Sequence, residues 1–565
     1  MGAYTVTDAC VGCTLCARRC PVGAVAGRPK EKHAIDAEVC IGCGLCGRLC
    51  ARGAILDGEG NPARRIPGDE WLRPQIDADA CAGCSVCIVN CPAHCLKLTE
   101  PERRGDIRTV ACLARETECI GCGRCAGACP IGAIVMWPAA SAACDEGGRS
   151  HMAGLFSRMW CRTFQGVMKV ANYFLGYRMP EYIEGAGSIR RLPEMMREKG
   201  ADNVLVVTDG NLIKLGLPDG LLAALKEGGF RFSLFSDIAP NPTSDDVEAG
   251  FRVYREQGCQ ALVAFGGGAP MDCAKAIAAK AVHPRRSVAQ LQGVLKVHKR
   301  IPLFFAVPTT AGTGSETTVA AVITDAATHR KAAINDPCII PKYAVLDPEL
   351  TMGLPPFVTA TTGLDALCHA VEAYTNHTYN TALENTLAKE AVRLVHGNLL
   401  MAYRHGDDPA ARQNMQKAAF FAGRAFTRGC VGYVHAVGHT LGGLYGVPHG
   451  LAMSVLLPHV MRQFGAAVHR RLAELADVCG MAGGSDEEKA EAFLAWIEEM
   501  QRGMQIPRGF DCIREEDVPQ IIAWAKKEAN PLYPVPVIWG DADFRRLLET
   551  VRLRQDGAAG GETFC

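Results

Sequence analysis

The chain has 565 residues, and its 60 Lys and Arg residues balance 60 Asp and Glu residues. A chain of this length exceeds one hydrophobic core, so we expect two to four domains. Zero net charge gives no overall attraction to nucleic acid, which we do not expect as a partner. Because no uninterrupted apolar run is long enough to span a bilayer, we do not expect membrane association either.

Cysteine is frequent, with 28 residues, and most of them fall in four runs with the spacing C-x2-C-x2-C-x3-C. This spacing places three thiolates on one tight loop around an iron–sulfur cubane, while the fourth thiolate binds a neighbouring cluster. Zinc is the alternative, but zinc needs four ligands per site rather than a triplet with a remote cysteine. The runs are Cys10, Cys13, Cys16 and Cys20; Cys40, Cys43, Cys46 and Cys50; Cys81, Cys84, Cys87 and Cys91; and Cys119, Cys122, Cys125 and Cys129.

Exchange of the fourth ligand between paired runs predicts four [4Fe-4S] clusters in two successive two-cluster units. The first unit would use Cys10, Cys13 and Cys16 with Cys50, and Cys40, Cys43 and Cys46 with Cys20. The second unit would use Cys81, Cys84 and Cys87 with Cys129, and Cys119, Cys122 and Cys125 with Cys91.

Both units resemble bacterial two-cluster ferredoxins, because the segments 21–25 and 130–134 follow their cysteine runs as in that family. Ala51 departs from the family, which carries proline there. We interpret the other cysteines of this region as small hydrophobic residues: Cys95, Cys112, Cys144 and Cys161. Cys10 leaves no room before it for a signal peptide, and exposed clusters need reduced thiolates, so we expect an anoxic cytoplasm.

Changes in composition divide the chain into domains. Ferredoxin-like α+β units are predicted at 1–56 and 74–138, joined by a charged, proline-containing linker at 57–73. A second linker follows at 139–176. Strand-like runs then alternate with helix-length segments, which predicts an α/β, Rossmann-like nucleotide-binding domain with a parallel sheet at 177–354. Helical patterns dominate residues 355–556 and predict an all-α metal-binding domain, followed by a tail at 557–565.

The second linker contains an amphipathic helix. Basic residues such as Arg158 and Lys169 lie on one side, and Trp160, Val167 and Phe174 lie largely on the other. We expect the apolar side to pack between the ferredoxin units and the following domain. Attachment to a membrane surface or docking of a partner protein is the alternative.

Two glycine- and hydroxyl-rich segments follow predicted strands of the α/β domain. Gly266, Gly267 and Gly268 open a helix that contains Asp272, so bare backbone can approach a pyrophosphate at the helix N-terminus. The segment 308–316 follows the next strand and offers further donors, among them Thr309, Thr310 and Thr313. Two such loops at strand C-termini predict a nucleotide crevice.

Asp209 ends an earlier predicted strand. A carboxylate there can bind an adenosine ribose and repel a 2′-phosphate, which favours NAD over NADP. A plain turn aspartate is the alternative.

The helical half concentrates candidate metal ligands. Asp365 and His369 are four residues apart and share one helix face, and His435, His439 and His449 follow in a glycine-containing segment. One carboxylate with neutral imidazoles suits Fe(II) or Zn(II).

Residues from about 172 to 555 resemble the iron-containing, group III alcohol dehydrogenases, whose fold is dehydroquinate synthase-like. The matching segments are 266–272, 308–316, 363–374 and 435–450, although Ala269 stands where that family usually carries serine. The resemblance implies a homo-oligomer in which a catalytic His439 lies near the nicotinamide and substrate, and Asn241 and Lys331 lie on the cofactor side. It implies that the metal ligands are Asp365, His369, His435 and His449.

These features predict an NAD-linked alcohol dehydrogenase or aldehyde reductase in which the metal acts as a Lewis acid on a small alcohol or aldehyde. His439 would relay the alcohol proton towards solvent. Clusters carry one electron, whereas nicotinamide takes a hydride, and no flavin fingerprint is visible in the sequence. We therefore expect the ferredoxin units to serve a flavoprotein or ferredoxin-linked redox partner. The alternative is an electron-transfer subunit of a larger complex, with the dehydrogenase-like part as a docking or regulatory module.

Overall fold

The computed structural model of the chain describes residues 3–68, 71–77, 81–99, 109–138, 149–326 and 331–553. Cys144 and the predicted tail at 557–565 lie outside these residues. The chain forms two compact units, residues 1–156 and 157–565, which are described separately below. Within the described part, none of the helices is long and apolar enough to cross a bilayer.

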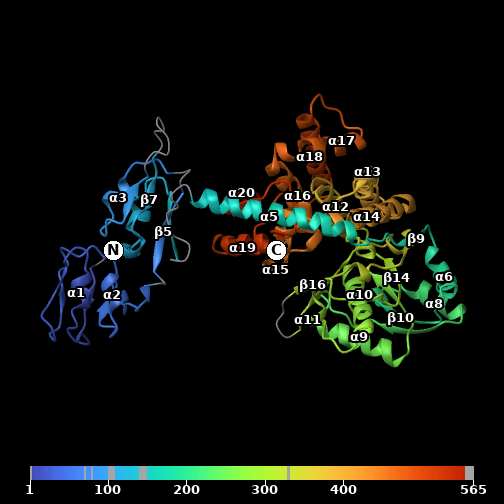
Figure 1. The fold of residues 1–565 in the computed structure, drawn as a ribbon, viewed down its shortest axis with the longest axis horizontal. Coiled ribbons are helices and arrows are strands. Elements are labelled where there is room, and N and C mark those ends of the chain that lie inside the picture. Colours follow the sequence, from blue (N-terminus) through green and yellow to red (C-terminus); the bar gives the residue numbers. More distant parts are fainter. Residues whose placement is uncertain are drawn as a thin grey trace. The chain divides into compact units, whose positions relative to one another are not determined.

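The first unit repeats one small motif four times, as the cysteine runs predict (Figure 1). Each run contains a short helix that includes its third cysteine and ends before its fourth, and a short strand follows each run. The helices are α1 (Leu15–Arg19), α2 (Leu45–Leu49), α3 (Val86–Val89) and α4 (Arg124–Ala128). The strand pairs are β1 (Thr5–Val6) with β4 (Ile55–Leu56), β2 (Val25–Ala26) with β3 (Ala34–Ile35), β5 (Leu72–Ile76) with β8 (Ile134–Pro138), and β6 (Leu96–Leu98) with β7 (Ala111–Leu113).

Left-handed backbone shapes each cysteine loop. The residue directly before the second cysteine is glycine in every run. In the first run this residue, Gly12, has φ of 64°. A Cβ on Gly12 would lie 2.6 Å from the Lys30 nitrogen, so only glycine fits this close approach. Each short helix is preceded by a further left-handed residue, such as Thr14 or Ser85, which turns the third cysteine back towards the first two.

The two ferredoxin halves of this unit are joined by a reciprocal pair of arginines. Arg48 Nη1 donates to the Gly121 carbonyl oxygen at 3.0 Å, and Arg124 Nη1 donates to the Ile41 carbonyl oxygen at 3.2 Å. Each arginine lies within a cysteine run, next to a cysteine or two residues after one, and reaches into the corresponding loop of the other half. The loops 40–46 and 119–125 therefore lie next to each other.

Helix α5 (Arg149–Phe174) leads into the second unit. Its polar side packs on the helical domain, because Gln165 Nε2 donates to the Pro531 and Tyr533 carbonyl oxygens at 3.2 and 2.9 Å. Its apolar side does not pack on the helical domain, because Trp160 is 62% exposed and Phe174 is 79% exposed. The prediction that this side packs between the ferredoxin units and the following domain is therefore wrong for the following domain from residue 158 onward. Hydrogen bonds to backbone carbonyl oxygens, together with the buried Cys161, hold the helix on this domain.

A six-stranded parallel sheet forms the centre of the α/β domain, in the order β11-β10-β12-β14-β17-β9. Strand β11 lies on one side of β10, and the next strand in the chain, β12, lies on the other side of β10. The strand order therefore reverses between β10 and β12. Ligands in such sheets bind at the carboxyl ends of the strands at this reversal. The strands are β9 (Glu181–Glu184), β10 (Asn203–Val207), β11 (Arg231–Phe235), β12 (Ala261–Gly266), β14 (Leu303–Pro308) and β17 (Tyr343–Leu346).

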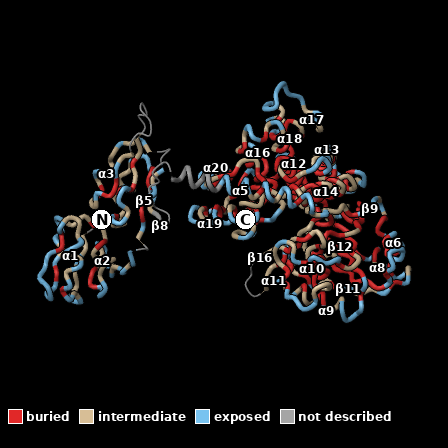
Figure 2. Tube along the Cα trace, in the orientation of Figure 1, coloured by how far each residue is buried: buried red, intermediate tan, exposed pale blue. Residues whose placement is uncertain are grey.

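Both faces of the sheet are covered by helices, and alternate residues of each strand point to opposite faces. Leu205 of β10 packs towards α9 (Ser244–Glu256) and α10 (Gly268–Val282), and Val206 packs towards α6 (Leu192–Glu198) and α8 (Asp219–Glu227). Shorter elements of this domain are α7 (Gly210–Lys214), α11 (Val288–Leu291), and a small sheet of β13 (Gly293–Val294), β16 (Lys331–Asn335) and β15 (Ala320–Thr324). Burial is dense throughout this part (Figure 2).

The helical domain follows and shares one large apolar core. Its first helix, α12, is buried along most of its length, which explains its near-continuous apolar sequence. The helices are α12 (Pro356–Thr375), α13 (Ala382–Arg404), α14 (Pro409–Gly429), α15 (Tyr433–Tyr445), α16 (His449–Phe464), α17 (Ala466–Val478), α18 (Asp486–Gly503), α19 (Val518–Ala529) and α20 (Asp541–Val551).

Candidate active site and cluster sites

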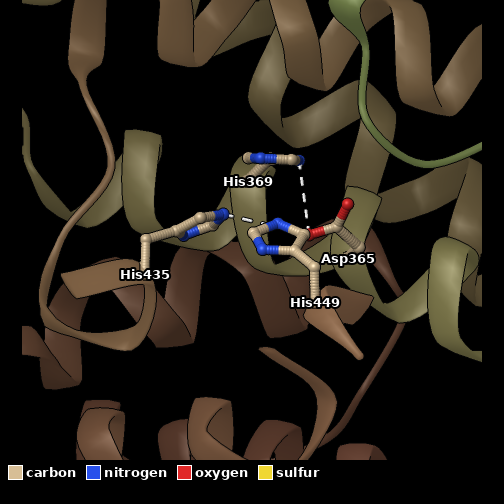
Figure 3. Close-up of side chains that lie close together, drawn as sticks. All are labelled: Asp365, His369, His435 and His449. Carbon is tan, nitrogen blue, oxygen red and sulfur yellow. Dashed lines mark ion pairs between the residues drawn. The ribbon is translucent and has the colours of Figure 1, made fainter. Parts of the chain in front are cut away.

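The four predicted metal ligands converge on one point of the helical domain (Figure 3). Asp365 and His369 come from α12, His435 from α15, and His449 from the first residue of α16. Their ligand atoms all lie within 4.8 Å of one another. Asp365 Oδ1 is 3.3 Å from His449 Nε2, 3.8 Å from His435 Nε2 and 3.9 Å from His369 Nδ1.

Three of these ligand atoms make no hydrogen bond with any described group: Asp365 Oδ1, His369 Nδ1 and His435 Nε2. Buried polar atoms rarely remain unpaired, because desolvation without a partner is costly. Burial also lowers the pKa of His369 to about 3 and that of His435 well below its usual value, so both imidazoles are neutral. A carboxylate and neutral imidazoles aimed at one point are the donor set of a divalent transition metal, and the residues fit such an ion.

Glu372, which the sequence analysis did not identify, binds the ring nitrogen of His435 that points away from the ligand cluster. Its Oε2 accepts from His435 Nδ1 at 2.5 Å, and its Oε1 accepts from the Val434 nitrogen at 2.8 Å. This contact directs Nε2 of His435 at the ligand cluster. Glu372 lies on the same helix face as Asp365 and His369, one turn after His369. This spacing in the sequence could have identified Glu372 as part of the site.

Replacing Glu372 by glutamine is expected to weaken metal binding by about 10–100-fold, because carboxylates behind ligand histidines orient the ring and raise its basicity. Glutamine keeps the size of the side chain and loses the charge. Titration of the metal-free protein with Fe(II) or Zn(II) measures the dissociation constant. An unchanged constant would contradict this role for Glu372.

His439 lies beside the ligand cluster without joining it. Its Nδ1 is 2.7 Å from Glu528 Oε1, and Tyr533 donates to the same carboxylate oxygen at 3.1 Å. The Glu528 contact assigns the proton to Nδ1 and leaves Nε2 as an acceptor. The His439 ring stacks on that of His449 with centroids 5.2 Å apart, and its side chain is 43% exposed. Glu528 and Tyr533 lie about ninety residues further along the chain, so no local signal pointed to them.

The glycine-rich and hydroxyl-rich loops meet at the carboxyl ends of β12 and β14, as predicted. Gly266 ends β12, Gly267 caps α10, and the Thr309 nitrogen donates to the Gly266 carbonyl oxygen at 3.1 Å. A Cβ on Gly267 would lie 3.4 Å from Thr310 Oγ1, and one on Gly268 would lie 3.5 Å from Thr313 Cγ2. Bare backbone and hydroxyls thus lie side by side at the N-terminus of α10, an arrangement that suits an anionic pyrophosphate.

The hydroxyl-rich loop also touches the metal-bearing helix. A Cβ on Gly312 would lie 2.6 Å from Thr362 Cβ, one turn before Asp365 on α12. The hydroxyl-rich loop and the ligand cluster are therefore neighbours.

The Asp272 carboxylate is hydrogen-bonded within the protein, on the side of the hydroxyl-rich loop. Its carboxylate accepts from the Val322 nitrogen at 3.0 Å and from Ser315 Oγ at 3.1 Å. Lys275, which is fully buried, donates to Ser315 Oγ at 3.0 Å and to Thr318 Oγ1 at 2.7 Å. These contacts anchor the hydroxyl-rich loop to α10, and a direct contact of Asp272 with a cofactor stays a prediction.

The remaining predicted cofactor residues lie on two further segments. Asp209 follows β10 and caps α7, with its carboxylate accepting from the Asn211 and Leu212 nitrogens at 2.9 and 3.1 Å. Lys331 Nζ donates to Asn241 Oδ1 at 2.7 Å, so these two residues, ninety positions apart, come together. Asp209 therefore is a helix cap at the strand-order reversal, where a ribose would lie.

Two cavities in the first unit have the cysteine linings that ligand exchange predicts. One is lined by Cys40, Cys43 and Cys46 together with Cys20. The other is lined by Cys119, Cys122 and Cys125 together with Cys91. Each combines a triplet with the fourth cysteine of the paired run, which fits a [4Fe-4S] cluster.

The other two predicted clusters use cysteines that the structure also describes. The Ala54 nitrogen donates to Cys50 Sγ at 3.3 Å, and the Ala133 nitrogen donates to Cys129 Sγ at 3.3 Å. The Ala111 nitrogen donates to Cys81 Sγ at 3.4 Å. Backbone donors of this kind stabilise thiolates. The other cysteines of these two sets, Cys10, Cys13, Cys16, Cys84 and Cys87, carry no disulfide.

Comparison with known proteins decides the family. Residues 180–348 match the iron-containing alcohol dehydrogenase model, residues 359–547 match the C-terminal model of that family, and residues 80–133 match the 4Fe-4S dicluster domain. The 1,3-propanediol dehydrogenase of Klebsiella pneumoniae is 37% identical over 368 residues, which cover 63% of this chain and 95% of that protein. The chain belongs to the iron-containing alcohol dehydrogenase family.

Other members of the iron-containing alcohol dehydrogenase family are similarly related. Alcohol dehydrogenase 4 of Schizosaccharomyces pombe is 39% identical over 357 residues, covering 62% of this chain and 83% of that protein. The solved structure of a 1,3-propanediol oxidoreductase has a TM-score of 0.64 and 34% identity, and covers 67% of this chain and all of that one. The predicted fold class is confirmed, and the protein is an oxidoreductase of this family with a 4Fe-4S dicluster domain before the dehydrogenase part.

Proposed function

We propose that the protein is a metal-dependent, NAD-linked alcohol dehydrogenase or aldehyde reductase whose ferredoxin units hold four [4Fe-4S] clusters. The dehydrogenase part rests on one observation: a buried carboxylate and three imidazoles converge beside the hydroxyl-rich loop. The NAD-dependent methanol dehydrogenase of Bacillus methanolicus, 36% identical over 353 residues, supports NAD as the coenzyme. The substrate class is a small alcohol or aldehyde, and the oligomer contains copies of this chain.

The chain's own residues supply binding and orientation. Asp365, His369, His435 and His449 would hold Fe(II) or Zn(II), which when bound supplies Lewis acidity towards an alcohol or aldehyde oxygen. The backbone of 266–268 and the hydroxyls of Thr310 and Thr313 would hold the coenzyme pyrophosphate. His439, fixed by Glu528, would accept a proton at Nε2 and pass it to solvent, to which its side chain is open.

Replacing His439 by alanine is expected to lower kcat for alcohol oxidation by about 10²-fold at neutral pH, the usual size of a general-base contribution. The loss should shrink in alkaline solution, where hydroxide removes the proton instead. A pH profile of kcat for both proteins tests this. Turnover that stays intact at all pH values would rule out the relay.

Replacing Asp209 by asparagine is expected to raise kcat/KM for NADP by about tenfold or more relative to NAD, because removal of a charge near a 2′-phosphate is worth at least 1.4 kcal/mol at close range. Asparagine caps helices as well as aspartate does, so the start of α7 is retained. Steady-state kinetics with both coenzymes measure the ratio. If the ratio stays constant, Asp209 is a helix cap only.

The ferredoxin units pose a separate question, because their clusters release single electrons. We propose that they serve a redox protein, flavoprotein or ferredoxin-linked, that completes the exchange with two-electron carriers. Clusters of this kind require a reducing, anoxic compartment, for which we propose the cytoplasm.

The test is anaerobic. The clusters are reduced, the reductant is removed, and NAD is added without alcohol while NADH fluorescence and the EPR signal of the reduced clusters are followed. We expect the clusters to stay reduced in the isolated chain. NADH that appears as the EPR signal fades would show a complete path within the chain and would overturn the need for a partner. A metal-replete preparation that does not oxidise NADH with any small aldehyde would instead favour an electron-transfer subunit.

A further inference from the structure

The fourfold repeat of the first unit carries one substitution at a buried position. The residue four places after the last cysteine of each run is alanine in three runs, at Ala24, Ala54 and Ala133, and cysteine in one, at Cys95. All four positions are buried, with exposures of 3%, 1%, 4% and 2% in that order. The fold therefore accepts alanine here, and Cys95 adds a thiol that packing does not require.

Cys95 lies within the predicted coordination sphere of a cluster. Its Sγ is 3.4 Å from Cys91 Sγ, and it lines the cavity that Cys91 shares with Cys119, Cys122 and Cys125. In the corresponding cavity of the first half, Ala24 takes this place beside Cys20. One cluster site thus has five thiols where its counterpart has four.

The chemistry of the pair fixes the direction of the contact. A cubane needs four thiolates, and the triplet 119–125 with Cys91 supplies them. A ligating thiolate can only accept a hydrogen bond, so the proton of the Cys91–Cys95 pair belongs to Cys95. In two other runs the backbone nitrogen of this position already donates to the last cysteine, at 3.3 Å in each, and the Cys95 side chain is an additional donor.

Hydrogen bonds to cluster sulfurs set reduction potentials, because a donor stabilises the reduced cluster, which carries one more negative charge. We propose that the Cys95 thiol donates to the Cys91 ligand and raises the reduction potential of the cluster bound by Cys91, Cys119, Cys122 and Cys125. This inference rests on the proposed cluster assignment. Cys95 is a positioning and tuning residue for this cluster and not one of its ligands.

The position of this cluster, next to the other half of the unit, gives its raised reduction potential a role in electron transfer. Its loop 119–125 adjoins loop 40–46 through the crossed arginine contacts Arg48 to Gly121 and Arg124 to Ile41. Electrons that pass between the two halves cross at these loops. A cluster of raised potential there holds the electron at the junction.

The test is a redox titration followed by EPR, with the iron content of each protein measured alongside. Cys95→Ala, which places the residue of the other three runs in the fourth, is expected to retain all four clusters and to move one midpoint potential, and only one, to a more negative value. Cys95→Ser keeps a donor and is expected to restore much of the shift. Cys112→Ala, in the same half but outside the cavity lining, is expected to change none of the four potentials.

Two results would overturn the inference. Four unchanged midpoints in Cys95→Ala would show that the thiol does not act on the cluster, and loss of one cluster would make Cys95 a ligand. Ala24→Cys is the reciprocal variant, and we expect it to raise one different midpoint. Fewer than four clusters in the unsubstituted chain would count against the proposed cluster assignment, whereas four clusters with no Cys95 effect would count against this inference alone.

Discussion

Replacing Asp365 by alanine is expected to lower alcohol-dependent NAD reduction by at least about 10³-fold, because loss of the metal removes several kcal/mol of stabilisation at the reacting oxygen. Asp365 Oδ1 is the atom on which His369, His435 and His449 converge, so its loss leaves three neutral imidazoles without their anion. Metal analysis should show the ion missing from the dehydrogenase site. The iron–sulfur absorbance should remain, because the clusters lie in the other compact unit.

Cys368→Ala is the matched control on the same helix. Cys368 is fully buried and forms a second possible ligand group with Glu372 and His435. In our assignment this group holds no metal, so the variant should keep both its metal content and most of its turnover. Loss of metal in Cys368→Ala, with metal retained in Asp365→Ala, would place the ion in the second group.

Replacing Gly423 by alanine is expected to destabilise the dehydrogenase unit by about 1–3 kcal/mol, as overpacking usually does. A Cβ at this position of α14 would lie 2.6 Å from the Gly314 carbonyl oxygen, in the hydroxyl-rich loop. Gly314 has φ of 59° and its own Cβ would lie 2.6 Å from Gly423 Cα, so backbone meets backbone here. Displacement of the loop should also raise KM for NAD. Thermal unfolding and steady-state kinetics measure the two effects.

Gly397→Ala separates this contact from helix propensity. Gly397 lies within α13, and a Cβ there would meet no described atom within 4 Å. Alanine is favoured over glycine in a helix interior by up to about 1 kcal/mol, so this variant should be as stable as the parent or more so. If Gly423→Ala behaved in the same way, the close approach of loop and helix would not matter.

The metal ligands could be predicted from the sequence because their spacing is local within each pair: Asp365 and His369 are one helical turn apart, and His435 and His449 lie within one short segment. Glu372 has the same kind of signal and could have been found. The partner of His439 could not, because Glu528 reaches it from another helix. The crossed arginines of the first unit are likewise tertiary contacts.

Helix α5 shows why amphipathicity alone did not predict orientation. The pattern correctly indicated two faces, but which face is buried depends on the surface that the helix meets. That surface presents the carbonyl oxygens of Pro531, Tyr533 and Pro536, and it selects Gln165 and Arg162. Cys95 was interpreted as a small hydrophobic residue, although comparison of the four runs would have distinguished it from the alanines.

The pairing at one edge of the central sheet constrains the order in which the parts of this protein can fold during synthesis. Strand β9 is the first strand made and pairs with β17, the last, about 160 residues later in the chain. Until β17 is made, β9 has no partner strand in this sheet, and only the opposite edge, at β11, is formed. The cysteine runs, by contrast, pair with near neighbours and precede the whole dehydrogenase part. Because domains fold as units from the N-terminus during synthesis, cluster assembly can begin on the nascent chain long before the nucleotide-binding sheet closes.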